Sequence, residues 1–317
     1  MSVTPKAPVK DDLKQTTASS ASRALNLLGD RWALMICSQA FVGVTRFEDF
    51  QSRIGIARSL LTERLRRLEN GGVLARHRYL ERPPRDEYRL TDRGEDLFNT
   101  ALMILRWEGL WHHDPKLRAH NLTHNCGHQL VPQCRCSHCD TEVLARDVNA
   151  LLGPGAGFDP APKARAQRRS TVEVRNNTEA KLERTIEVLG DRWVAHTIAA
   201  AFNGCHRFGE FQQKMGIATN ILSERLARLV TLGVFEQRPY QTQPVRMEYR
   251  LTQKGLDLFP LVVTLVEWGQ KWLSGPEGPP EILMHNCGQP LHARIVCAHC
   301  KKVVSRESLS GLHATPQ

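Results

Sequence analysis

The stretch RFEDFQSRIGIARSLLTERLRRLENGGV, residues 46–73, decides the fold. Its first part places three apolar side chains at helical spacing, namely Phe47, Phe50 and Ile54. After Gly55 a second helical pattern follows, and its inner face carries Leu61, Leu65 and Leu68. Two short helices joined by a glycine-containing turn are typical of a helix-turn-helix, whose second helix enters the major groove of DNA.

The flanking segments extend this motif. Residues 22–41 predict one helix that ends before Gly43. Residues 73–91 predict a β-hairpin, because strand-like residues flank the basic tip Arg82-Pro83-Pro84-Arg85. A helix-turn-helix followed by such a hairpin is a winged helix. Residues 94–113 predict a last helix, and an apolar helix outside a small core usually makes a dimer contact.

The whole series occurs twice. From Gly29 to Tyr79, 23 of 51 positions are identical to residues 190–240, with no gap in the alignment. The same offset of 161 still joins Cys126 to Cys287 near the end of each copy. The chain is therefore a duplicated domain, with each copy long enough for a core of its own.

Three motifs recur in the same order in both copies. They are Gly-Asp-Arg-Trp (29–32 and 190–193), Leu-(Thr/Ser)-Glu-Arg-Leu (61–65 and 222–226) and Glu-Tyr-Arg-Leu-Thr (87–91 and 248–252). With the segments around them, over roughly residues 22–115 and 183–276, they resemble the HxlR-type family of winged helix-turn-helix transcription regulators. The resemblance implies a repressor or activator that binds double-stranded DNA as a dimer. Because one chain carries two copies, the pair could form an intrachain pseudo-dimer, and a homodimer of the whole chain stays open.

The composition and the lack of catalytic motifs favour a nucleic-acid-binding protein over an enzyme. The net charge of +10 and pI of about 9.3 favour an anionic partner. No apolar run approaches the ~20 residues of a membrane span, and the first residues lack the apolar core of a signal peptide, so we expect a cytoplasmic protein without a membrane partner. Phosphate-loop, nucleophile-elbow and zinc-protease motifs are all absent from the sequence.

Candidate DNA contacts follow from groove chemistry, in which Arg reads guanine and Asn reads adenine. The start of each recognition helix should reach base edges, through Arg58, Ser59 and Thr62 in copy one and Thr219, Asn220 and Ser223 in copy two. Phosphate or minor-groove contacts are expected from Arg66, Arg82, Arg85 and Arg246. Because the copies differ at the reading positions, we expect an asymmetric or pseudo-palindromic operator. Arg64 and Arg225, beside Glu63 and Glu224, are as well explained by structural ion pairs.

Each copy ends in the pattern H-x-C-x9-C-x2-C. The residues are His124, Cys126, Cys136 and Cys139 in copy one, and His285, Cys287, Cys297 and Cys300 in copy two. Three thiolates and one imidazole make a closed tetrahedral zinc site, so one structural zinc per copy, two per chain, is expected. Reduced cysteines without metal and a metal or redox sensor remain alternatives, with His138 and His299 as rival ligands. Cys134 is not expected to be a ligand, because Ile295 stands at its place in copy two.

The fold class is therefore mainly α with small β-hairpin wings (α+β), built as tandem winged helices that are each followed by a zinc-ribbon-like Cys/His segment. The expected boundaries are a disordered tail (1–20), winged helix one (21–120), Cys/His segment one (121–150), a linker (151–180), winged helix two (181–281), Cys/His segment two (282–310) and a tail (311–317). The expected function is sequence-specific transcription regulation, with repression favoured and no effector identified. A winged-helix scaffold for protein docking and a metal- or redox-responsive regulator are the alternatives.

Overall fold

The computed structural model describes residues 15–112, 122–160, 188 and 190–312. In copy one the winged helix is formed by α1 (Ser20–Leu28), α2 (Arg31–Phe41), α3 (Phe47–Ile54), α4 (Arg58–Asn70), β2 (Leu74–Leu80), β3 (Arg85–Leu90), α5 (Asp92–Glu95) and α6 (Phe98–Trp111). Gly55, at φ 69°, makes the left-handed turn between α3 and α4, a conformation that glycine adopts without steric cost. The helix-turn-helix and the hairpin that follows it lie where the sequence predicted them.

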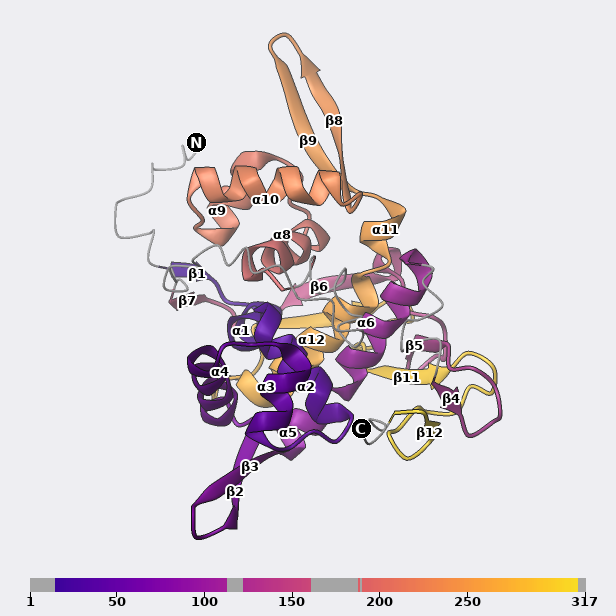
Figure 1. Ribbon diagram of the computed structural model, residues 1–317. Helices are drawn as coiled ribbons and strands as arrows, with labels where there is room; N and C mark the ends of the chain where they lie inside the picture. The colour runs from indigo at the N-terminus through magenta and orange to yellow at the C-terminus, as the bar shows by residue number, and fades with distance from the viewer. Residues whose placement is uncertain (1–14, 113–121, 161–187, 189, 313–317) are drawn as a thin grey trace.

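Copy two repeats the arrangement. Its elements are α8 (Arg192–Phe202), α9 (Phe208–Met215), α10 (Thr219–Thr231), β8 (Phe235–Thr242), β9 (Val245–Leu251), α11 (Gln253–Leu256) and α12 (Phe259–Leu273). The two wings, β2–β3 and β8–β9, extend from opposite ends of the molecule, whereas α6 and α12 lie between them at its centre (Figure 1). Within the described residues, no helix combines the length and the apolar character needed to span a bilayer.

The expected single helix over residues 22–41 is wrong, because it is broken at Gly29 and Asp30. The Asp30 carboxylate accepts hydrogen bonds from the backbone N–H groups of Trp32 and Ala33, both at 3.1 Å, and so caps a new helix. The predicted last helix of the copy is also divided, into α5 and α6, but α6 begins after Leu97 without a side-chain cap. A capping residue inside an apolar periodic run therefore sets the boundary at Asp30.

Around the Cys/His residues, six strands after the two winged helices form two-stranded sheets that each join one copy to the other. The six strands are β4 (Thr123–His124), β5 (Pro132–Cys136), β6 (Val148–Leu152), β10 (Glu281–His285), β11 (Ala293–Cys297) and β12 (Leu309–Ser310). They pair antiparallel as β4 with β12, β5 with β11 and β6 with β10. The β5–β11 ladder is centred on Cys134 opposite Ile295, which are equivalent positions of the two copies. The pairing is therefore pseudo-symmetric.

Tryptophans also join the copies in matched pairs. The indole N–H of Trp107 donates to the Lys254 carbonyl at 2.9 Å, and that of its equivalent Trp268 donates to the Arg93 carbonyl at 2.8 Å. Arg93 and Lys254 are themselves equivalent positions. Both tryptophans are almost fully buried, so these two hydrogen bonds lie inside the contact between the copies.

Two further segments differ from the expected boundaries. Part of the predicted N-terminal tail is ordered, since β1 (Gln15–Thr17) pairs with β7 (Phe158–Pro160) and α1 begins at Ser20. The predicted linker likewise begins inside structure, because Leu151 and Leu152 belong to β6. The rest of the linker, from residue 161, lies outside the described residues, as does the tail from residue 313.

Candidate functional site

The recognition helix of copy one presents the residues that the sequence selected. Arg58, Ser59, Thr62 and Arg66 are all exposed on α4. The Arg58 guanidinium lies over the Phe47 ring at 4.9 Å, a contact that orients this side chain at the start of the helix. The Thr62 hydroxyl donates to the Arg58 carbonyl at 2.9 Å and keeps its lone pairs free to accept a hydrogen bond.

The recognition helix of copy two has a different chemistry at the same place. Thr219, Asn220 and Ser223 are exposed on α10. The Gln212 amide donates to the Thr219 hydroxyl oxygen at 2.9 Å, so a side chain of α9 fixes the first residue of α10. Copy one thus exposes a cation at the start of this helix, where copy two exposes an amide and hydroxyls.

Behind each recognition helix lies an aspartate that caps the helix before the helix-turn-helix, Asp30 on α2 and Asp191 on α8. Arg64 reaches Asp30 at 3.1 Å, and Arg225 reaches Asp191 at 2.7 Å; the four side chains are at most 15% exposed. Arg67 adds a second ion pair to Asp30 at 2.6 Å. Arg64 and Arg225 also pair with Glu63 and Glu224, which confirms the structural ion pairs. These arginines hold each recognition helix against the helix whose N-terminus the aspartate caps.

The wings carry exposed arginines at their tips, namely Arg82, Arg85 and Arg246. Near the outer end of the first strand of each wing, a tyrosine packs against an arginine of the helix-turn-helix. The guanidinium of Arg46 lies over Tyr79 at 5.1 Å, and the equivalent Arg207 lies over Tyr240 at 4.3 Å. Arg46 and Arg207 are exposed between helix and wing in both copies. The sequence analysis missed them, although their identity at equivalent positions was visible.

The eight zinc ligands expected from the sequence lie in two clusters, and each cluster contains residues of both copies. One consists of His124, Cys126, Cys297 and Cys300, and the other of Cys136, Cys139, His285 and Cys287. In each cluster the four candidate ligand atoms lie within 4.8 Å of one another. The expectation that each copy closes its own site is therefore wrong. Because the strands pair across the copies, the H-x-C end of one copy meets the C-x2-C end of the other.

The distances within the clusters match a tetrahedral zinc ion. Bonds of about 2.3 Å to sulfur and about 2.0 Å to nitrogen place two sulfurs about 3.8 Å apart, and a sulfur and a nitrogen about 3.5 Å apart. Cys126 Sγ and Cys297 Sγ are 3.9 Å apart. The Sγ–Nδ1 distance is 3.5 Å both from Cys300 to His124 and from Cys139 to His285. His138 and His299 belong to neither cluster.

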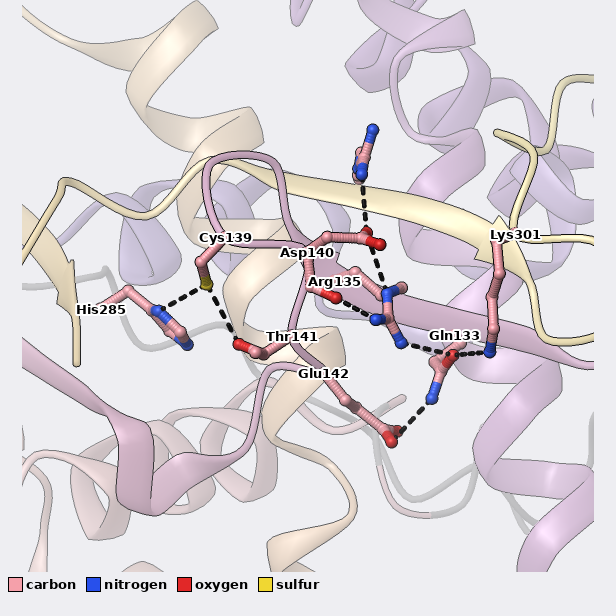
Figure 2. Close-up of polar contacts among 9 residues, drawn as sticks. Gln133, Arg135, Cys139, Asp140, Thr141, Glu142, His285 and Lys301 are labelled. Atoms are coloured by element: carbon pink, nitrogen blue, oxygen red, sulfur yellow. Dashed lines mark hydrogen bonds and ion pairs between the residues drawn. The ribbon is translucent and has the colours of Figure 1, made fainter. Parts of the chain in front are cut away.

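Figure 2 shows Cys139 and His285 of the second cluster, with polar side chains to one side of Cys139. The Thr141 hydroxyl lies 3.1 Å from Cys139 Sγ, and its hydrogen bond to the sulfur lowers the pKa of Cys139 to about 7. This favours the thiolate form that a metal requires. Nearby, Arg294 donates to Asp140 at 2.6 Å and Lys301 donates to Gln133 at 3.0 Å. Both contacts join copy two to copy one beside the cluster.

The remaining cysteines are packing residues. Cys134 is 1% exposed in the centre of the β5–β11 ladder, and burial raises its pKa to about 12. Burial also raises the pKa of Cys37 to about 12, and Cys205 is buried near the start of α9. Cys37, Cys134 and Cys205 all lie outside the two Cys/His clusters.

The sequence could not show which of the eight residues share a cluster, because the H-x-C and C-x2-C spacings are the same in both copies.

The model of the HxlR-like helix-turn-helix family matches the chain twice, over residues 27–116 and 188–277. Two curated relatives illustrate the similarity. The uncharacterized HTH-type transcriptional regulator MT3179 of Mycobacterium tuberculosis is 41% identical over 135 residues, which are 42% of this chain and 82% of that protein. The uncharacterized HTH-type transcriptional regulator YvaP of Bacillus subtilis is 34% identical over 94 residues, 29% of this chain and 87% of that protein. Each relative thus corresponds in length to about one copy.

Proposed function

Because the chain belongs to the HxlR-like helix-turn-helix family, whose members are transcription regulators and not enzymes, we propose that it regulates transcription by reading double-stranded DNA with both of its winged helices. The observation that supports this best is the repeated geometry of the reading surface. Each recognition helix is fixed from behind by a buried arginine–aspartate pair and presents its first turn to solvent. Such a helix can enter the major groove of DNA without a rearrangement of its winged helix. A protein that reads the chromosome acts in the cytoplasm of a bacterial cell.

The two copies act as one pseudo-dimer within a single chain. The apolar last helix of a copy is expected to make a dimer contact. The last helices of the two copies, α6 and α12, contact each other. Trp107 and Trp268 tie each copy to the other with equivalent hydrogen bonds. A homodimer is therefore not needed to bring two recognition helices together. The operator has two unequal half-sites, because Arg58 suits guanine and Asn220 suits adenine.

Two zinc ions hold the pseudo-dimer together, one in each cluster. Three thiolates and one imidazole leave no open coordination position, which is the pattern of a structural site. Removing either ion would release a pairing between strands of different copies, so the metal stabilises the contact between the copies. We assign repression as the mode of action, since a protein spanning two half-sites at a promoter excludes the polymerase from them.

A DNA-binding assay on the full chain tests this function. Genomic fragments retained by the protein would first yield an operator, and binding to it would be measured at several salt concentrations. Arg58→Ala and Asn220→Ala should each weaken binding by about 1–3 kcal/mol and relax base preference at one half-site only. Arg85→Ala should weaken binding to all sequences and reduce the salt slope by about one.

Arg146→Ala is the matched control, since Arg146 is exposed but lies in the short 3-10 helix Ala145–Asp147, outside both winged helices. This variant should bind as the unaltered protein does. Retention of DNA that does not depend on salt, Arg58 or Asn220 would support the protein-docking alternative and refute the DNA-reading proposal.

A further inference from the structure

A cavity of about 350 Å³ lies between the two copies, away from the recognition helices' first turns and from the Cys/His clusters. Copy one contributes α1 and β6 to its wall, and copy two contributes α8, α12 and β10. These elements converge in the upper middle of the molecule in Figure 1. A volume of this size falls within the range of about 300–1,000 Å³ that is typical of small-molecule sites.

Most of the cavity wall is apolar. The α12 side contributes Phe259, Val262, Val263 and Val266, and α8 contributes Ala199 and Ala200. Leu152, 85% exposed, and Leu151, 54% exposed, lie at its edge on β6. Trp193 also lines the cavity. Three charged side chains, Asp159, Lys214 and Glu281, also line the cavity. Asp159 pairs with Arg23, and Glu281 accepts a hydrogen bond from the Ser20 backbone N–H. A ligand that lies against the α8 and α12 side of the wall must therefore be largely apolar there.

Two polar atoms of residues in the wall lack a partner within the part of the chain that the structure describes, Oδ1 of Asn26 and Nε2 of His196. His196 on α8 is 8% exposed, and its Nδ1 lies 3.2 Å from the Ser22 hydroxyl of α1. Among the described residues its Nε2 has no hydrogen-bond partner, although the atom is buried. A buried polar atom without a partner is energetically unfavourable. A ligand in the cavity that hydrogen-bonds Nε2 would remove this disadvantage.

The imidazole is also uncharged at neutral pH, because burial, aided by nearby Arg192, lowers its pKa to about 4. The cavity therefore offers no histidine cation to an anionic ligand. Since Ser22 can either donate to Nδ1 or accept from it, Nε2 is either a donor or an acceptor. A hydroxyl group satisfies both cases, because it donates and accepts.

Copy two has this buried histidine, and copy one does not. The equivalent of His196 in copy one is Met35, a buried core residue. A methionine at this position thus packs in the same fold without a polar group. The histidine is not required by the winged-helix framework, and the comparison supplies a replacement that the framework tolerates.

We propose that this cavity binds a small, uncharged, mostly apolar molecule that bears a hydroxyl group, and that His196 Nε2 makes the hydrogen bond to that hydroxyl. The ligand touches both copies at once, since α1 and β6 come from one and α8, α12 and β10 from the other. Occupancy consequently favours the packed arrangement of the copies over any arrangement that opens the cavity. The site stands independently of DNA binding.

The test uses 2-naphthol as the probe and 2-methylnaphthalene as its match, in which a methyl group replaces the hydroxyl. Binding to the full chain would be measured by equilibrium dialysis. We expect one site per chain, with 2-naphthol bound roughly five- to tenfold more tightly than 2-methylnaphthalene, the value of about one neutral hydrogen bond.

His196→Met should abolish that preference while still admitting both probes, and His77→Met, an exposed wing histidine, should leave it unchanged. Ser22→Ala provides a second variant, since it removes the partner of Nδ1 and should lower the preference without altering the core. Absence of saturable binding to the unaltered chain would overturn the proposal. An unchanged preference in both His196→Met and Ser22→Ala would overturn it as well.

Discussion

Replacing one buried tryptophan at the contact between the copies should destabilise the whole chain. Trp107 is 1% exposed and donates its indole N–H to the Lys254 carbonyl of the other copy at 2.9 Å. In Trp107→Phe that carbonyl loses its donor, which costs about 1–3 kcal/mol. Loss of the second ring removes on the order of 40 Å² of buried apolar surface, about 1 kcal/mol at 25 cal/mol/Å². We therefore expect a loss of about 2–4 kcal/mol in the free energy of unfolding.

Trp111→Phe is the matched control. Trp111 makes the same kind of contact, to the Asp257 carboxylate at 3.0 Å, but it is 36% exposed. Water can replace its hydrogen bond, so its loss should cost less than about 1 kcal/mol. Urea titrations followed by circular dichroism would compare the variants, and the unaltered chain should unfold in one transition because both copies share the contact. Equal effects of the two substitutions, or separate unfolding of the copies, would refute the reasoning.

Three further substitutions probe separate features of the structure. Burial raises the pKa of Glu267 to about 7. The free energy of unfolding should therefore fall as the pH rises from about 4.5, the pKa of this carboxyl in the unfolded chain, to about 7. Glu267→Gln should remove this slope and stabilise the protein above pH 7, which urea titrations at several pH values would measure. Cys134→Val should leave the zinc content, measured by plasma emission spectrometry, unchanged, and a loss of metal would make Cys134 a ligand after all. Asp30→Asn removes the charge that Arg64 and Arg67 face and should lower the melting temperature more than Asp140→Asn, whose carboxylate is half exposed; similar shifts would show that burial of the pair is immaterial.

The parts of the fold that depend on one copy were predictable from the sequence. Phe50, Leu61 and Leu65 are fully buried, as their helical spacing indicated. Local periodicity sufficed here because these side chains pack within their own winged helix. The break at Asp30 was also within reach, since Gly-Asp before a helix is a stop followed by a cap, but the apolar period on both sides concealed it.

The candidate metal sites show where sequence reasoning reaches its limit. The eight residues were found from their spacing, and the exclusion of Cys134 followed from Ile295 at the equivalent position. Their partners were not found, because a repeat with the same spacing pairs equally well within a copy and between copies. Only the antiparallel pairing of β5 with β11 and of β6 with β10 decides between the two. His196 was overlooked for a related reason, since its environment is built by α1 of the other copy.

The measurement that tests the shared clusters most directly is the zinc content of two double variants after dialysis against a weak chelator. Cys126 and Cys297 belong to one cluster, whereas Cys126 and Cys136 belong to different ones. The unaltered chain should retain two zinc ions. Cys126→Ala with Cys297→Ala should retain one ion, because the other cluster keeps all four ligands, and Cys126→Ala with Cys136→Ala should retain none. One ion in the second double variant and none in the first would contradict the account.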